Sequence, residues 1–269
     1  MDAVTEEEPE NEPIGAAAPD DAPSYQRFDC REPDQRAAGI DAARRAVEAG
    51  ECVVLPTDTV YGIGANSFSA SAVQRLLDAK GRGRDMPPPV LIAEPSVMMA
   101  LGRDIPEPAK RLAEQHWPGP LTIILQAQPS LQMDLGETRG TIAVRVPDHE
   151  LARELLRATG PLAVSSANRT GRPAATDAEV AADQLGDRVA VYLDDGPTRG
   201  AESSTIVDFT RSDYGAVVRH GALSIDELRR TVPYLDDRAP APASAGPEVE
   251  PEPAPGPIAE NENESNGAG

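Results

Sequence analysis

Apolar and polar positions alternate along the middle of the chain in two different patterns. Some segments have apolar residues three and four positions apart, as in a helix, and others are short apolar runs, as in buried strands. Helices are expected at 36–49, 71–80, 108–116, 148–158 and 176–185, and strands at 51–56, 60–64, 90–93, 121–126, 141–146, 161–165, 189–193, 205–209 and 216–219. Because the two kinds of segment alternate, the pattern predicts a single α/β domain with a mixed β-sheet.

Two pairs of residues are typical of helix starts. Thr176 with Glu179 and Ser224 with Glu227 each have the spacing of a capping box, in which the first side chain accepts a hydrogen bond from the backbone of the second residue. The first pair predicts that the helix at 176–185 opens at Thr176, and the second predicts a last helix after Ser224.

Both ends of the chain are acidic and poor in large apolar residues. Residues 1–26 hold eight acidic residues and no base, and residues 239–269 hold six glutamates and no base. Such segments cannot bury enough apolar surface to offset the conformational entropy lost on folding. We therefore expect a disordered acidic tail over 1–26, a folded domain over 27–235 and a disordered Pro/Glu-rich tail over 236–269. Most of the formal net charge of −20 comes from the two ends.

Composition also restricts the class of protein. The acidic N-terminus lacks the apolar region of a signal peptide, and no apolar run is long enough to cross a bilayer, so we expect a cytoplasmic protein with no membrane partner. The two cysteines, Cys30 and Cys52, are then expected to be reduced thiols. The histidines are scattered, and no His/Cys cluster has the spacing of a zinc site, so we predict no protein-held metal.

The segment "KGRGRDMPPP" at 80–89 carries three cations at alternating positions, Lys80, Arg82 and Arg84. Glycines between them allow backbone N–H groups to approach a ligand, and the prolines that follow stiffen the loop. This arrangement suits a polyphosphate, which needs several converging donors. A solvated basic loop, or one that contacts RNA phosphates, fits the segment equally well. It is not a P-loop, because no GxxxxGK[ST] is present.

The segment "VVLPTDTVYG" at 53–62 ends a buried strand in a polar corner. Pro56 is followed by Thr57, Asp58, Thr59 and Tyr61. On its own this corner fits an ordinary turn about as well as the floor of a binding site, and only together with the loop at 80–89 and Arg145 does it predict polar groups that face a cleft.

Arg145 lies inside an apolar strand, "AVRVPDH", so its side chain must find an anion. That anion is either a structural carboxylate in the protein or a ligand carboxylate, which a guanidinium can bind through two hydrogen bonds.

Small polar residues or arginine also stand at the ends of other predicted strands, at Ser165, Ser166, Asn168, Ser203, Ser204, Thr205 and Arg219. Such residues are common in turns, and they also line clefts at the edges of sheets in α/β proteins. Together they predict a concave polar cleft without a His or Cys nucleophile.

Seven segments together resemble one family, the YrdC-like threonylcarbamoyl-AMP synthases. They are "LPTDTVYGIGA", "KGRGRDMPPPVLI", "WPGPLTIIL", "TIAVRVPDH", "AVSSANRTGRPAAT", "SSTIVDFT" and "VVRHGAL", in the family's order and spacing over about residues 35–230. The resemblance implies a single YrdC-like domain with a twisted mixed sheet and flanking helices around a concave cleft.

The resemblance further implies a nucleotidyltransferase. Family members join L-threonine, bicarbonate and ATP into threonylcarbamoyl-AMP and release pyrophosphate, and a partner transferase moves the threonylcarbamoyl group to tRNA. The substrate supplies the nucleophile, since its carbamate oxygen attacks the α-phosphate, and Mg²⁺ is expected on the phosphates. A weak direct contact with tRNA is a further partner that the resemblance allows.

Matched position by position, the resemblance implies roles for twelve residues. Lys80 and Arg82 would hold the triphosphate as the catalytic cations. Threonine would contact Thr59, Arg145, Ser165 and Ser204. ATP would also contact Met86, Thr141, Ala167, Asn168, Ala175 and Arg219. The chain departs from the family at two places, with Leu91 where a histidine is frequent and "MPP" at 86–88 where "NPL" is usual.

Two other interpretations remain open at this point. The chain could be a relative of the family that uses the same arginine-lined face to bind tRNA or double-stranded RNA without catalysis. The net-negative domain argues against strong binding to a phosphate backbone. A relative could also keep the fold and form a carbamoyl-adenylate instead.

Overall fold

The computed structural model describes residues 23–200 and 202–240. The strands there are β1 (Gln26–Asp29), β2 (Val53–Leu55), β3 (Gly62–Asn66), β4 (Val90–Leu91), β5 (Leu121–Gln126), β6 (Thr141–Arg145), β7 (Leu162–Ser166), β8 (Val191–Asp194), β9 (Thr205–Asp208), β10 (Ala216–Arg219) and β11 (Asp236–Asp237). The α-helices are α1 (Pro33–Glu48), α2 (Ala70–Lys80), α3 (Met98–Leu101), α4 (Glu107–His116), α5 (Glu150–Thr159), α6 (Ala178–Leu185) and α7 (Ile225–Thr231), and 3₁₀ turns lie at Pro95–Val97 and Gly186–Arg188.

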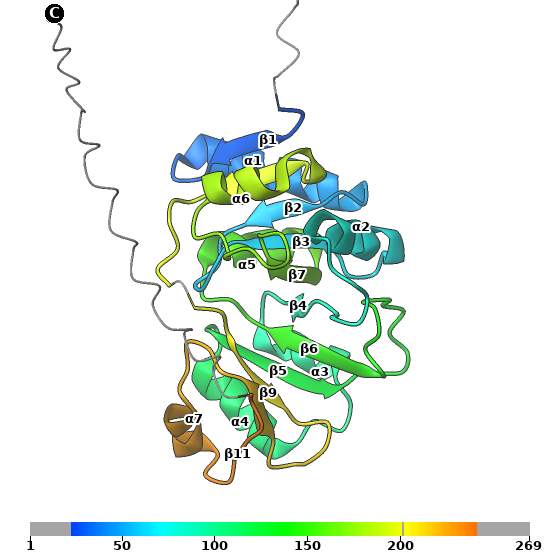
Figure 1. The fold of residues 1–269 in the computed structure, drawn as a ribbon, viewed down its shortest axis with the longest axis vertical. Coiled ribbons are helices and arrows are strands. Elements are labelled where there is room, and N and C mark those ends of the chain that lie inside the picture. The colour runs from blue at the N-terminus through cyan, green and yellow to red at the C-terminus, as the bar shows by residue number, and fades with distance from the viewer. Residues whose placement is uncertain (1–22, 201, 241–269) are drawn as a thin grey trace, which may run out of the picture. The chain divides into compact units, whose positions relative to one another are not determined.

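The strands of the described residues form one mixed sheet, in the order β1-β8-β2-β3-β7-β4-β6-β5-β9-β10-β11 (Figure 1). Neighbouring strands run antiparallel in pairs such as β2–β3 and β5–β6, and parallel in pairs such as β4–β6 and β5–β9. The predicted α/β class with a mixed sheet is confirmed. The strand order, which brings β4 between β7 and β6, could not be read from the sequence.

Around β2, helices cover both faces of the sheet, because β2 and its neighbouring strands are apolar on both sides. Val53 and Leu55 pack in one cluster with buried residues of α1 and α5, including Val47 and Leu155. Val54, which points the opposite way, belongs to the larger cluster that contains residues of α2, α4, α6 and α7. Each strand there is thus buried between two layers of helices.

The strands β5, β6 and β9 differ, because the face opposite α4 and α7 lines a cavity instead of a helical layer. Ile123, Val144 and Val207 are fully buried in the larger core cluster. Their neighbours on the other face, such as Ile124 and Ile206, are half-buried and line the cavity. The alternation of side chains along a strand therefore produces both the core and the cavity wall from the same segments.

The helix starts agree with the sequence at one of the two predicted caps. Ser224 accepts a hydrogen bond from the backbone N–H of Glu227 (3.2 Å) and begins α7, as predicted. The predicted cap of α6, Thr176, is wrong by one residue. Asp177 accepts a hydrogen bond from the N–H of Val180 (2.8 Å), and the helix begins at Ala178. An Asp at that position offers an anionic acceptor near the positive end of the helix, which makes it at least as good a cap as Thr176.

The structure also contains elements that the apolar pattern did not predict. β1 begins inside the predicted N-terminal tail and β11 lies inside the predicted C-terminal tail, so the sheet extends slightly beyond 27–235 at both ends. Both are edge strands that pair parallel with β8 and β10, and such pairing needs no apolar run of their own. The rest of the two predicted tails, 1–22 and 241–269, lies outside the described residues.

Candidate active site

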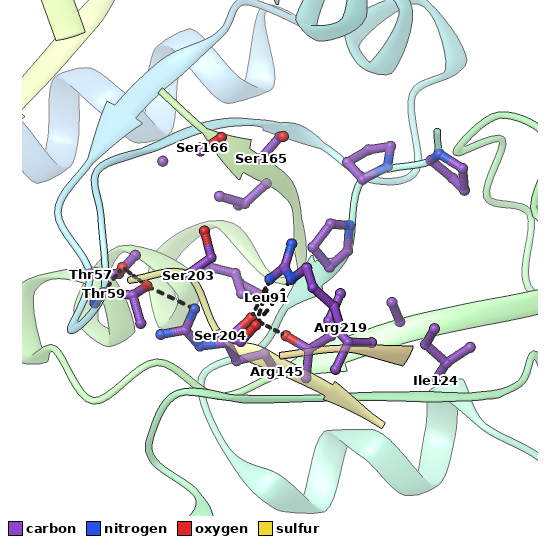
Figure 2. A pocket seen from close by; sticks show the side chains of 18 of the residues that line it. Thr57, Thr59, Leu91, Ile124, Arg145, Ser165, Ser166, Ser203, Ser204 and Arg219 are labelled. Atoms are coloured by element: carbon purple, nitrogen blue, oxygen red, sulfur yellow. Dashed lines mark hydrogen bonds between the residues drawn. The ribbon is translucent and has the colours of Figure 1, made fainter. Parts of the chain in front are cut away.

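A cavity of about 250 Å³ lies against the half of the sheet that α1 and α5 do not cover. Its wall comes from the corner between β2 and β3, the triproline segment before β4, and residues of β4, β5, β6, β7, β9 and β10. Figure 2 shows the polar side chains at its centre, where Thr59, Arg145, Ser204 and Arg219 come together from four separate segments. The predicted concave polar cleft is therefore present.

The corner at residues 56–61 is held by its own hydroxyl groups. Thr57 Oγ1 donates to the carbonyl of Val60 (2.6 Å) and accepts from the backbone N–H of Thr59 (3.2 Å). The two threonine hydroxyls are 3.0 Å apart, and both residues line the cavity (Figure 2). Tyr61 lines the cavity too, but its hydroxyl donates to the carbonyl of Gly196 (2.6 Å), so this polar group does not face the cleft as predicted.

Gly62, the first residue of β3, is required by the close packing of this corner. A Cβ at this position would come within 2.6 Å of Val164 Cγ1 on β7. The strand can therefore approach its neighbour only without a side chain at Gly62.

Arg145 ends β6 with its guanidinium fixed at three points. Nε donates to the carbonyl of Gly119 (3.0 Å), Nη1 to Thr59 Oγ1 (3.0 Å) and Nη2 to Asp58 Oδ1 (2.6 Å). Three of the five N–H donors of the guanidinium are used in this way, which leaves one on each terminal nitrogen. Burial lowers the pKa of Arg145, and the carboxylate of Asp58 opposes that shift. The sequence left open a protein or a ligand anion; Asp58 is the protein anion, and two donors remain for a ligand.

A second arginine, Arg219 of β10, holds the end of β9. Its Nη2 donates to the carbonyl (2.7 Å) and the hydroxyl (3.0 Å) of Ser204, and Ser204 Oγ lies 2.7 Å from Thr122 Oγ1 (Figure 2). Burial lowers the pKa of Arg219, and the positive charges of Arg145 and Arg82 lower it further. These three guanidinium groups therefore lie close enough to repel one another.

Arg82 contributes the third positive charge to the cavity. Its Nη1 donates to Ser165 Oγ (2.9 Å), and its Nε is buried without a hydrogen-bond partner. Burial lowers its pKa. Within residues 23–200 and 202–240, no aspartate or glutamate lines the cavity. Three cations without a lining carboxylate make the cavity a binding site for anions.

Lys80 lies behind the cavity wall and does not line it. Its ammonium donates to the carbonyl of Ser166, the carbonyl of Asn168 (2.6 Å) and Asn168 Oδ1 (3.4 Å), so it ties the end of α2 to the turn after β7. Burial, with a smaller contribution from Arg82, lowers the pKa of Lys80 to about 8.

The remaining predicted residues divide into two groups. Thr141 lines the cavity, as do Thr59, Arg82, Arg145, Ser165, Ser204 and Arg219. Met86, Ala167, Asn168 and Ala175 do not line it. Met86 is exposed, the N–H of Ala167 donates to the carbonyl of Tyr61 (2.8 Å), and the carbonyl of Ala175 accepts from the N–H of Tyr61 (2.9 Å). Their contacts with a nucleotide stay predictions.

The sequence did not single out several residues of the cavity wall. Thr122 of β5 reaches Ser204 from a strand that looked purely apolar, and Leu135 and Thr138 come from the loop before β6. This loop is held against the phosphate-loop candidate, because Arg84 pairs with Asp134 and does not line the cavity. No local signal in "LQMDLGETRG" indicates this contact. Leu91, at the position of the family's frequent histidine, is buried and lines the cavity.

In the part of the chain that the structure describes, no group of three or more His, Cys, Asp or Glu residues could hold a metal ion. Among the same residues, no helix combines the length and the apolarity that crossing a membrane requires. Cys30 and Cys52 are both buried free thiols, and burial raises the pKa of each to about 12.

Comparison with known proteins gives consistent results. Residues 45–221 match the Sua5/YciO/YrdC family model, described as "Telomere recombination". The chain is 51% identical over 201 residues, 75% of this chain and 92% of the relative, to a Mycobacterium tuberculosis H37Rv protein named "putative threonylcarbamoyl-AMP synthase". Its fold is similar to Pyrococcus abyssi Sua5 complexed with L-threonine (TM-score 0.69, 35% identity, 74% of this chain and 58% of that one). It is also similar to Escherichia coli YciO (TM-score 0.65, 28% identity, 76% and 97%).

Proposed function

Because the chain belongs to the Sua5/YciO/YrdC family, we propose that it is a threonylcarbamoyl-AMP synthase, a nucleotidyltransferase of tRNA modification. The substrates are L-threonine, bicarbonate and ATP, and the products are threonylcarbamoyl-AMP and pyrophosphate. The structural observation that carries the proposal is the placement of Arg82, Arg145 and Arg219 around one cavity without a lining carboxylate. Such a cavity fits an amino-acid carboxylate and a polyphosphate side by side.

The reaction needs no nucleophile from the protein. The threonine amine adds to the carbon of bicarbonate with loss of water and gives a carbamate. A carbamate oxygen then attacks the α-phosphorus of ATP, the bond from that phosphorus to the bridging oxygen breaks, and pyrophosphate leaves. The protein contributes by orienting the two reactants and by stabilising the negative charge that develops on phosphate oxygens.

The geometry supports a division of the cavity between the two substrates. Arg145 has one free N–H on each terminal nitrogen, which suits the carboxylate of threonine; the hydroxyl of Thr59 is bonded to it, and Ser204 lines the same cavity. Arg82 and Arg219 remain for the phosphates. Ser165 is shared between the two halves, since its hydroxyl accepts from Arg82.

Mg²⁺ and the partners are further parts of the proposal. We expect Mg²⁺ to enter bound to the phosphates of ATP and to water. The product is a reactive mixed anhydride, so a threonylcarbamoyl transferase must consume it and pass the group to tRNA. We propose that the reaction takes place in the cytoplasm, a reducing compartment in which the two buried free thiols would stay reduced.

The test is the threonine-dependent exchange of labelled pyrophosphate into ATP in the presence of bicarbonate. We expect exchange with the wild-type protein and a strong loss in Lys80→Ala and Arg145→Ala. Absence of exchange with any amino acid would refute the proposal. If carbamoyl phosphate supports exchange in place of threonine, the chain is a carbamoyl-adenylate-forming relative. If RNA binds with a steep salt dependence that neither ATP nor threonine changes, the non-catalytic interpretation is correct.

A further inference from the structure

We propose that Asp58 is a positioning residue, which sets the orientation of Arg145 toward the carboxylate of threonine. The proposal rests on the proposed function, since it assigns the amino-acid half of that site. Asp58 is not among the residues that line the cavity. Its effect would therefore act through Arg145.

Asp58 accepts two hydrogen bonds through one carboxylate oxygen. Its Oδ1 accepts from Arg145 Nη2 (2.6 Å) and from the backbone N–H of Asp148 (3.0 Å). The exposed fractions of the two side chains are 7% for Arg145 and 10% for Asp58, so water screens this ion pair little. One carboxylate oxygen thus joins the corner after β2 to the turn between β6 and α5, with the guanidinium between them.

The three anchors of Arg145 have different effects on the guanidinium. Gly119 fixes Nε and Thr59 fixes Nη1, but only Asp58 fixes Nη2. A carboxylate ligand that bridges the two terminal nitrogens needs both in a defined plane. Because the guanidinium is rigid and planar, loss of the acceptor at Asp58 leaves only the anchors at Gly119 and Thr59, and the whole group can then tilt away from the carboxylate of threonine.

The second carboxylate oxygen of Asp58 makes it possible to test the position of the acceptor and the negative charge separately. Oδ2 is buried and has no hydrogen-bond partner. An asparagine at this place can keep the Oδ1 acceptor and put its amide nitrogen where Oδ2 lies, so it removes the charge and keeps the geometry. A glutamate keeps the charge, but its additional methylene moves the acceptor. If orientation is what matters, glutamate should be the more harmful of the two.

The experiment compares Asp58→Asn and Asp58→Glu in the pyrophosphate exchange assay, with the KM for threonine and the KM for ATP measured separately. We expect the KM for threonine to rise about tenfold in Asp58→Glu and less than about threefold in Asp58→Asn, with the KM for ATP unchanged in both. Calorimetric binding of L-threonine to the full chain should show the same order. If Asp58→Glu does not fold, Asp58→Ala replaces it, because alanine removes the acceptor without adding volume.

Glu154→Gln is the matched control, since Glu154 binds Arg36 Nε (2.9 Å) outside the cavity and its loss should leave both KM values unchanged. A merely structural role would lower thermal stability and raise the two KM values together, and that outcome overturns the proposal. A larger effect in Asp58→Asn than in Asp58→Glu also overturns it. If the wild type shows exchange but both variants keep its KM for threonine, the role of Asp58 is refuted and the proposed function stands. If the wild type shows no exchange, the proposed function itself is refuted.

Discussion

Lys80 allows a quantitative test of how the phosphates are bound, because the residue is only 3% exposed and the hydrogen bonds of its ammonium go to uncharged acceptors. Burial lowers its pKa from the ordinary value of 10.5 to about 8. This difference corresponds to a penalty of ~3 kcal/mol for the charged form in the ligand-free protein. A phosphate group that binds nearby favours the charged form and should raise the pKa of Lys80 toward its ordinary value.

The expected result is an uptake of protons when ATP binds at pH 9. At that pH, Lys80 is mostly neutral in the free protein, and it becomes mostly charged if the phosphates restore its pKa. We therefore expect roughly one proton taken up for each ATP bound. Isothermal titration calorimetry measures this number directly, when the binding enthalpy is compared in two buffers of different ionisation enthalpy.

The perturbation is Lys80→Met, which keeps a long unbranched side chain and removes the titratable group. Proton uptake at pH 9 should disappear in this variant and persist in Lys110→Met. Lys110 is the matched control because it pairs with Glu107 on α4 and does not line the cavity. Equal proton uptake in Lys80→Met and the wild type would show that the phosphates do not act on Lys80, and the reasoning would fail.

The same pKa predicts how stability depends on pH. Between about pH 8 and 10.5 the unfolded chain holds the Lys80 proton and the folded chain does not. The free energy of unfolding should therefore rise with pH across this window by up to ~3 kcal/mol relative to Lys80→Met. Urea unfolding of the two proteins at pH 7.5 and at pH 10 measures the difference, and a difference of opposite sign contradicts the assigned pKa.

Four further substitutions have defined outcomes. Arg145→Lys should raise the KM for threonine about tenfold or more, because an ammonium cannot form two parallel hydrogen bonds to a carboxylate; an unchanged KM in the exchange assay would contradict this. Gly62→Ala should lower the free energy of unfolding by ~1–3 kcal/mol, because its Cβ would lie within 2.6 Å of Val164 Cγ1, and urea unfolding checks it. Asp177→Ala should lower the free energy of unfolding by ~1 kcal/mol in the same measurement, and Thr176→Ala should lower it less. The reverse order would show that Thr176 is the cap of α6.

The phosphate-loop candidate shows where sequence reasoning was incomplete. Three alternating cations at 80–84 suggested three converging donors, but only Arg82 lines the cavity. Lys80 turns to the carbonyls after β7, and Arg84 pairs with Asp134 on the loop before β6. Spacing along a loop does not determine which side chain faces inward, because distant segments supply partners for the other two. Asp134 lies 50 residues from Arg84, and Asn168 lies 88 residues from Lys80.

The polar residues at strand ends were predicted more successfully. Thr59, Arg145, Ser165, Ser204 and Arg219 all line one cavity, whereas Asn168 and Thr205, which the same pattern selected, do not. Each stands at or beside the end of a short apolar run, and a polar group at such a place must meet either solvent or a cleft. The local pattern therefore identified these positions without any knowledge of the strand order.

The sequence by itself determined the α/β class, most of the strands and helices, and the polar character of the corner at residues 57–59. These features depend on local periodicity and on the chemistry of neighbouring residues, which the chain carries at every position. Only the tertiary structure decided that Asp58 binds Arg145, that Lys80 lies behind the wall, and that Thr122 and Leu135 belong to the cavity. Those relations depend on the sheet order, which brings segments distant in the sequence together through pairings that no single segment encodes.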